Sequence, residues 1–475
     1  MTSFLQSIKH HRLIAAFLGI AALSSCKKFA SVPPPNNELT TQTLFTTDAT
    51  VLAALASLYT LTYISNYQYF QDDLSLCPGN SADELHYYTS NSTYDPYYHN
   101  NIDLTNYEDL GLWSAFYKGA YVANSIISGV QADSAYLTDT IRTQAIGESE
   151  FMRAFCYFYL VNFWGDVPLV LSTDAIVTTN STRTSKTAVY AQIVADLLDA
   201  QTKLKPDYST SSTGSRIRPN QYAATALLAR VYLYLGQYSD AEAQATTVIN
   251  ASSLYALQTG ANLGSVFLKN NTEAIFQMDG ATNNQTFLGY NDQGWNYTFY
   301  NLYLAQPWFV MDSSLVAAFE PGDLRFTNWV SSTNYLGTND YYPTKYKNIN
   351  ATTDGTAEAY VYLRLAEQYL IRAEARAQQG NTSDAASDIN VIRNRAGLGN
   401  TTAASQADLL LAVEQERRVE LFTEVGHRWF DLNRTNRAAA VLGADKTAWS
   451  SNAALYPIPE TEIENDPNLT QNPGY

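Results

Sequence analysis

The chain has 475 residues, of which 46% are hydrophobic and 16% charged, so it can bury a large core and is too apolar to be disordered. Its 29 Lys and Arg against 45 Asp and Glu give a net charge of −16. Without a basic stripe, this charge argues against nucleic acid as a partner, because phosphates require clustered Lys and Arg. The 35 tyrosines exceed what a core needs, so we expect many of them at surfaces.

Residues 1–25 have the pattern of an export signal. A basic start is followed by an apolar run over residues 13–23, which is too short to span a membrane as a helix. Residues 23–26, Leu-Ser-Ser-Cys, resemble the bacterial lipobox, in which the cysteine is lipidated after cleavage. We therefore expect Cys26 to be the lipidated first residue of the mature chain, which anchors it to a membrane.

A polar, proline-bearing segment follows the signal. Three prolines at residues 33–35 keep it extended, so we predict a lipidated N-terminus and tether over residues 26–42. The remaining organisation that we expect is one domain over residues 43–475, with a helical scaffold in 43–255 and 357–432 and a loop-rich region in 260–356.

Helical periodicity dominates the first half of the chain. Apolar residues recur at steps of three and four, as at Leu52, Leu55 and Tyr59. Gly165 and Pro168 then end one of these helices. The helices that we predict cover residues 49–63, 108–130, 141–163, 187–204 and a hairpin over 219–251.

Two predicted helical hairpins share a pattern of small residues. The matching positions are Ala229, Gly236 and Ala241 in the first hairpin and Ala373, Gly380 and Ala385 in the second. This pattern resembles the tetratricopeptide repeat, in which alanines pack the helix pair and a glycine opens the turn. Such pairs cannot bury their faces alone, so we expect several of them to stack into one framework. The alternative is two unrelated amphipathic hairpins.

The second hairpin begins with a helix that we expect to include residues 363–375. Its two sides differ in polarity, which is typical of a helix that covers a core. The apolar side carries Tyr362, Leu365, Tyr369, Ala373 and Ala377, and the polar side carries Glu367, Arg372, Glu374 and Arg376.

The composition and periodicity of the sequence change over residues 260–356. Gly, Asn, Thr and aromatic residues become frequent and the helical period fades, which predicts irregular loops with short strands. We expect one strand at residues 274–278 and one helix near residues 313–320. After Asp431, a proline-bearing tail is expected to lie extended on the domain.

The cysteines and histidines do not have the spacing of a metal site. Cys156 lies in an apolar helical run, where a free thiol is the common state, so a disulfide with Cys77 is the less favoured alternative. His86, His99 and His427 stand alone in the sequence. We expect neither a metal nor a cofactor.

A charged cluster near the end of the helical part contains residue types that also occur in catalytic sites. We interpret it as structural, because Glu414 and Arg418 lie one helical turn apart and the other charges can form ion pairs. No metal-binding helix, nucleophile elbow or phosphate-binding loop occurs, so we do not expect an enzyme. A carboxylate pair for glycoside hydrolysis is the catalytic alternative. The cluster comprises Arg417, Arg418, Glu420, Arg428 and Asp431.

Several separated stretches of the mature chain share one resemblance. They are residues 26–29, 44–47, 116–124, 153–154, 163–169, 416–422, 426–432, 457–459 and 471–475. In this order and spacing they are similar to the SusD/RagB family of surface lipoproteins. The resemblance implies a mainly α fold, a tetratricopeptide-like right-handed α-α superhelix with loop-rich insertions that bind glycan. It also implies a SusC-like TonB-dependent outer-membrane transporter as partner, while no binding residue of the family can be carried over.

Aromatic residues in the predicted loops are the candidates for ligand binding. A sugar ring packs its C–H face on an aromatic ring, while its hydroxyls need amides or acids nearby. The alternative is that these rings pack the loops together or contact the transporter. The candidates are Tyr94, Tyr97, Tyr98 and Asn101, then Trp295, Asn296, Tyr297 and Tyr300, and finally Trp329 and Tyr335.

We therefore expect a non-catalytic, lipid-anchored protein of the outer membrane that faces the exterior. It would capture an oligosaccharide or polysaccharide and deliver it to the transporter. A scaffold of stacked hairpins could also present a peptide, and such a peptide-binding lipoprotein feeding a peptide transporter is the alternative. A third possibility is a lid on the transporter, with recognition shared between the two proteins.

Overall fold

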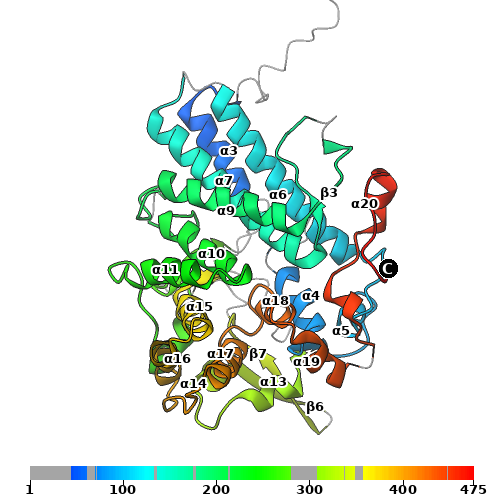
Figure 1. Ribbon diagram of the computed structural model, residues 1–475, viewed down its shortest axis with the longest axis vertical. Coiled ribbons are helices and arrows are strands. Elements are labelled where there is room, and N and C mark those ends of the chain that lie inside the picture. Colours follow the sequence, from blue (N-terminus) through cyan, green and yellow to red (C-terminus); the bar gives the residue numbers. More distant parts are fainter. Residues whose placement is uncertain are drawn as a thin grey trace, which may run out of the picture.

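The computed structural model describes residues 44–60, 70, 72–132, 136–174, 178–211, 214–279, 307–335, 337–347, 357–446 and 448–475. Within them, helices form most of the molecule and the strands are short and paired in twos (Figure 1). This arrangement confirms the predicted mainly α fold. None of the helices in these ranges has the length and hydropathy needed to cross a lipid bilayer.

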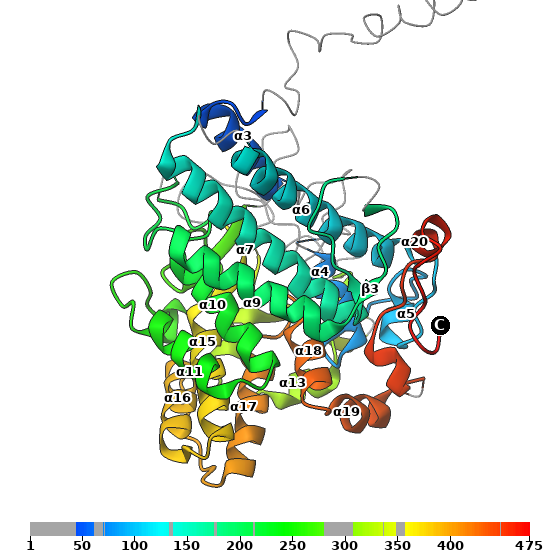
Figure 2. The same ribbon diagram turned by 45° about the horizontal axis from the view of Figure 1, so that its top comes forward.

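The helices stack on one another in chain order. In both views they run from α3, α6 and α7 at one end of the molecule to α16 and α17 at the other (Figures 1 and 2). This stack of hairpins is the predicted framework, with ends within a few residues of those expected. The order is α3 (Asp48–Thr60), α6 (Tyr107–Ala132), α7 (Asp139–Trp164), α9 (Lys186–Lys203), α10 (Gln221–Tyr234), α11 (Tyr238–Ile249), α15 (Leu365–Gln378), α16 (Thr382–Arg395) and α17 (Gln406–Glu420).

Small side chains allow the hairpins to approach closely. Ala229, Ala241, Ala245 and Ala375 are fully buried between α10, α11 and α15. Gly380 ends α15 with φ at +79°, and a Cβ added there would meet nothing within 4 Å. The left-handed backbone, not lack of space, therefore requires glycine at this turn.

The second hairpin begins later than the sequence predicted. Tyr362 to Arg364 belong to the strand β8 (Ala359–Arg364), which pairs with β4 (Ala274–Asp279), and α15 begins only at Leu365. All six residues of β8 are buried. An apolar run buried on both faces lacks the strict alternation that would have distinguished it from a helix.

The side of α15 that was predicted to be polar is also largely enclosed. Glu367 accepts hydrogen bonds from Arg230 Nε at 2.6 Å and Nη2 at 2.7 Å. Glu374 accepts hydrogen bonds from both terminal nitrogens of Arg434. Arginines from other helices thus compensate carboxylates that the periodicity of α15 alone would leave in solvent.

Short antiparallel strand pairs and helices order the loop-rich region. The strand predicted at residues 274–278 is β4, and the helix predicted near residues 313–320 is α13 (Ser313–Ala318). The region also contains α14 (Leu324–Trp329), the 3₁₀ turn η2 (Gly260–Ser265), the strand β5 (Phe309–Met311) and the pair β6 (Val330–Tyr335) with β7 (Thr338–Pro343). Outside it lie α4 (Asp73–Ser81), α5 (Asp95–Tyr98), the strand β1 (Leu85–Tyr87), which pairs with β5, and the pair β2 (Val167–Pro168) with β3 (Arg183–Thr184).

The C-terminal tail lies on the domain, as predicted, but it is not extended throughout, because helices continue to form after Asp431. After α18 (His427–Arg434) and α19 (Ala438–Asp445), the backbone N–H of Tyr456 donates to the Phe163 carbonyl at 2.8 Å. The amide of Asn472 donates to the Trp164 carbonyl at 3.0 Å. The tail, which includes η3 (Ser451–Ala454) and α20 (Glu460–Asn465), is therefore fastened to the end of α7.

A network of buried charges joins the loop-rich region to α16 and α17. Glu420 accepts hydrogen bonds from Arg364 Nη1 at 2.6 Å, from Arg325 Nη1 at 3.3 Å, and from Arg395. Burial alone would raise the pKa of Glu420, but these three guanidinium groups hold it below its usual value. The carboxylate therefore stays charged inside the core.

The charged cluster predicted to be structural forms ion pairs in the same part of the molecule. Arg417 Nε lies 2.6 Å from Asp431 Oδ2, and Arg428 Nε lies 2.7 Å from Asp83 Oδ1. The helical pair expected within α17 is not the one that forms. Glu414 instead pairs with Arg428 and Arg437, and Arg418 pairs with Asp83.

Cys77 and Cys156 are both free thiols and both fully buried, as favoured by the sequence. Burial raises the pKa of each thiol above its usual value. A Cβ at Gly119 on α6 would lie 2.6 Å from the sulfur of Cys156 on α7. The glycine therefore sets how closely these two helices pack.

Candidate functional site

The predicted residues Tyr94 to Asn101 lie on the loop that leads from β1 to α6 and contains α5. Tyr94 and Tyr98 are half-buried and Asn101 is exposed. Tyr97 points inward with 0% exposure, and its hydroxyl donates to Asn106 Oδ1 at 3.1 Å. Three of these four predicted residues are thus open to solvent, while the ring of Tyr97 belongs to the core.

The pairing of β1 with β5 brings together rings that are distant in sequence. Its register places Tyr87 opposite Phe309, next to Trp308. The rings of Tyr87 and Tyr94 stack with centroids 6.1 Å apart and an interplanar angle of 7°, and Trp308 lies 5.5 Å from Tyr87. We call Tyr87, Tyr94 and Trp308, all half-buried, the aromatic face, whereas the ring of Tyr98 lies 5.7 Å from that of His86.

Contacts from beneath hold the aromatic face in place. The Tyr94 hydroxyl donates to Asp73 Oδ1 at 3.1 Å, and Phe309 packs edge-on against both Tyr87 and Tyr94. On the same loop, the ring of Tyr98 has the ammonium of Lys446 at 4.8 Å from its centre. The rings are therefore held in fixed positions, which lowers the entropy lost when a flat ligand binds.

Burial changes the pKa values of Lys446 and Tyr98. Burial lowers the pKa of Lys446 to about 7, against the opposing effect of Asp83, Asp312 and Asp445. Burial also raises the pKa of Tyr98. The hydroxyl of Tyr98 therefore stays protonated at neutral pH and can donate a hydrogen bond.

The remaining predicted residues do not join the aromatic face. Trp329 is 1% exposed, and its indole N–H donates to the Leu263 carbonyl at 2.9 Å, so neither side of its ring is open to a ligand. Tyr335 ends β6, and its side chain is outside the described part of the chain. The predicted residues that lie outside the described ranges are Cys26, Trp295, Asn296, Tyr297 and Tyr300.

The sequence reasoning missed Trp308. It stands apart from the tyrosine-rich stretch by more than two hundred positions, and only the β1–β5 pairing unites the two. The apolar run of residues 308–311 is a strand signal that could have suggested such a pairing. Its partner strand is not apparent from that pattern.

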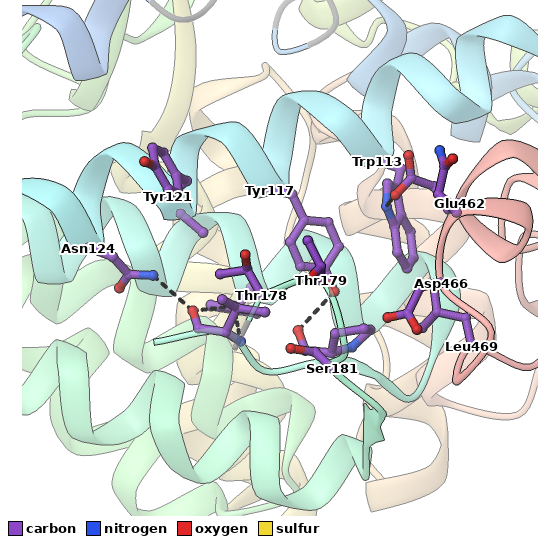
Figure 3. A pocket seen from close by; sticks show the side chains of 15 residues that line it. Trp113, Tyr117, Tyr121, Asn124, Thr178, Thr179, Ser181, Glu462, Asp466 and Leu469 are labelled. Atoms are coloured by element: carbon purple, nitrogen blue, oxygen red, sulfur yellow. Dashed lines mark hydrogen bonds between the residues drawn. The ribbon is translucent and has the colours of Figure 1, made fainter. Parts of the chain in front are cut away.

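A second pocket lies between α6, residues 168–170 and 178–181, and the C-terminal tail. It encloses about 330 Å³. Trp113, Tyr117 and Tyr121 form a row along α6 above it, and Glu462 and Asp466 lie beside Trp113 (Figure 3). We call this place the α6 hollow. Among the described residues, no group of three or more His, Cys, Asp and Glu side chains could hold a metal ion.

Two family profiles match the chain. The profile described as "SusD family" matches residues 276–475, and the one described as "Starch-binding associating with outer membrane" matches residues 34–233. The two matches do not overlap, and together they cover the helical parts of the chain except for residues 234–255, which include α11. They agree with the resemblance stated from the sequence.

Individual proteins support the same assignment. SusD-like protein P2 of Formosa agariphila is 28% identical, over 78% of this chain and 82% of that protein. A SusD superfamily protein from Bacteroides vulgatus has a TM-score of 0.78 at 21% identity, over 91% of this chain and 100% of that chain. A laminarin binding SusD-like protein has a TM-score of 0.77 at 24% identity, over 91% and 100%. The chain belongs to the SusD family, whose members are starch- and glycan-binding proteins associated with the outer membrane.

Proposed function

We propose that the chain is a cell-surface glycan-binding lipoprotein that captures an oligosaccharide and delivers it to a partner SusC-like TonB-dependent transporter. The observation that carries the proposal is the aromatic face, where Tyr87, Tyr94 and Trp308 lie side by side at the surface. Asn91 borders these rings, because its side-chain oxygen accepts a hydrogen bond from the Tyr94 backbone N–H at 3.2 Å. Flat rings beside amides are the combination that a sugar requires.

The acids next to the aromatic face have positioning roles, which supports binding without cleavage. Asp95 accepts hydrogen bonds from the Ser90 hydroxyl at 2.8 Å and from the Asn91 backbone at 2.9 Å. Asp73 accepts one from the Tyr94 hydroxyl. Incubation with neutral polysaccharides is expected to yield no new reducing ends, and their appearance would make the protein a glycosidase.

Calorimetry tests the role of the aromatic face. The double variant Tyr87→Ala with Trp308→Ala removes two half-buried rings, and we expect at least a tenfold loss of affinity for the oligosaccharide that the native chain binds, since stacking on one ring contributes about 1 kcal/mol. Tyr136→Ala is the matched control, because Tyr136 is 73% exposed in the loop between α6 and α7. Equal affinity in the double variant and the control would contradict the proposal.

The choice of probes separates sugar from peptide. Laminari-oligosaccharides, malto-oligosaccharides and a peptide library are titrated against the same protein. Binding of a peptide, with none of any glycan, would replace the proposed function by the peptide-binding alternative.

The anchor and the partner need separate experiments. We expect Cys26→Ala to release the protein from the membrane and to abolish labelling by a fatty-acid analogue. We also expect the native chain to co-purify with a large transporter after gentle detergent extraction. Extracellular protease should cleave the protein on intact cells if it faces the exterior.

A further inference from the structure

We propose that the α6 hollow is a second sugar-binding site, separate from the aromatic face, and that it takes a short neutral oligosaccharide. The inference rests on the proposed function only for the class of ligand. Its geometry is independent, because α6, residues 168–170 and 178–181, and α20 form it. Figure 3 shows these walls with the rings on one of them and acids on another.

The spacing of the rings on α6 matches a linear ligand. Trp113, Tyr117 and Tyr121 recur every four residues, so the Cα atom of each lies about 6 Å further along the helix than the one before. Trp113 and Tyr117 lie 4.8 Å apart at an angle of 47°. Tyr121 is 50% exposed, Tyr117 is half-buried, and Trp113 closes the inner end. The row therefore opens from a closed end toward solvent.

Hydrogen bonds fix the floor of the hollow. The Tyr117 hydroxyl donates to the Pro168 carbonyl at 2.8 Å. The Tyr157 hydroxyl and the Asn124 amide both donate to the Val170 carbonyl at 2.9 Å. These bonds tie the segment after β2 to α6 and α7, so the hollow exists before a ligand arrives.

The rim at the inner end supplies hydrogen-bond acceptors. Glu462 and Asn465 on α20, with Asp466 just after it, line the hollow. Glu462 Oε2 accepts from the Trp113 indole N–H at 3.2 Å, which aligns the acid with the row of rings. No Lys, Arg or His is among the residues that line the hollow. Sugar hydroxyls can donate to these acids, whereas sulfated or uronic sugars would be repelled.

The size of the hollow agrees with this class of ligand. A volume of about 330 Å³ is at the lower end of the range for small-ligand pockets, which suits a few sugar rings rather than a folded partner. An apolar chain would fill the row of rings but would leave the acids of the rim without partners.

The test counts binding sites on the mature chain. Neutral laminarihexaose and maltoheptaose are titrated by calorimetry, with oligogalacturonate as the acidic counterpart. We expect two sites for the neutral ligand that binds and no binding of oligogalacturonate in the α6 hollow. Tyr121→Ala should remove the site in the α6 hollow, and Glu462→Gln should weaken binding at that site by at least threefold. The Tyr136→Ala control should keep both sites.

The double variant of the aromatic face separates this inference from the proposed function. It should lose the other site and keep the one that depends on Tyr121. If Tyr121→Ala leaves the site count unchanged while the double variant abolishes binding, the second site is refuted and the proposed function stands. If neither set of changes affects binding, or if no neutral ligand binds, both are refuted. Unfolding curves check that each variant is folded.

Discussion

The hairpins of α10, α11, α15 and α16 and the loop-rich region around Arg325, Lys345 and Arg364 are stabilised in different ways. Apart from the buried pair of Arg230 and Glu367, the hairpins are packed through alanines and short apolar side chains, with ion pairs such as that of Glu242 and Arg376 near their surface. The loop-rich region is joined to α17 by charges that are almost completely buried.

This difference predicts different sensitivities. Close packing of small side chains responds to volume, because an added methylene has no space to occupy. A buried charge network responds to the loss of a single partner, because the remaining charges lose their compensation. Four substitutions examine the comparison, beginning with the largest expected effect.

Removing Glu420 should be the most damaging change. Glu420→Ala leaves the buried guanidinium groups of Arg364, Arg395 and Arg325 without a shared carboxylate. We expect a loss of about 3–5 kcal/mol in the free energy of unfolding, measured by chemical denaturation. Glu242→Ala in the hairpins is the control and should lose at most about 1 kcal/mol. Equal losses would remove the contrast between the two regions.

The pH dependence of stability should also originate in the buried charges. Burial, and then the charge of Asp83, raises the pKa of Glu84 to about 8, compared with 4.5 as its ordinary value. Between these values the folded chain binds the proton and the unfolded chain does not, so stability falls as pH rises. The loss from this group is expected to approach about 1 kcal/mol per pH unit.

Urea unfolding at pH 5, 6, 7 and 8 measures this slope. Glu84→Gln cannot ionise and should therefore have a flatter profile than the native chain. Glu460→Gln changes an exposed glutamate and should leave the native slope intact. If Glu84→Gln retains the full slope, the pH dependence has another origin.

Overpacking tests the hairpins directly. Ala375→Leu places a larger side chain among the buried alanines between α11 and α15, and we expect a loss of about 1–3 kcal/mol. The control Ala243→Leu lies on the exposed side of α11 and should change stability by less than about 0.5 kcal/mol. A neutral Ala375→Leu would show that the hairpins are packed more loosely than the contacts indicate.

The smallest effect is expected at the hairpin turn. Gly380→Ala meets no neighbouring atom, so only its left-handed backbone is strained, and we expect a loss of about 1 kcal/mol in thermal or chemical unfolding. Gly399 is equally unobstructed but lacks a left-handed backbone, so Gly399→Ala should show no loss. A similar result for both glycines would mean that the turn can relax.

The hairpins could be predicted because their signal is local. Alanine and glycine spacing indicated both turns, and the residues that build each hairpin are neighbours in the chain. The start of α15 was misjudged because Tyr362 continues the helical spacing of Leu365 and Tyr369 although it lies in β8. Strand pairing with β4, ninety residues earlier, overrides that local pattern.

The charge network and the aromatic face could be predicted only in part. Arg230 and Glu367 are separated by 137 positions, and no periodicity connects two such residues. Tyr94, Tyr98 and Asn101 were predicted for the binding surface from composition and are open to solvent. Composition could not separate them from Tyr97 and Trp329, whose rings are enclosed, because exposure depends on how distant segments pack.

The enclosed thiols of Cys77 and Cys156 make this protein convenient for fluorescence labelling. Both resist ionisation and are shielded from reagents, so maleimide dyes should leave them unmodified. With Cys26 acylated, Tyr136→Cys would introduce a single reactive sulfur on a solvent-facing loop. A dye placed there would report movement of the domain on living cells in real time.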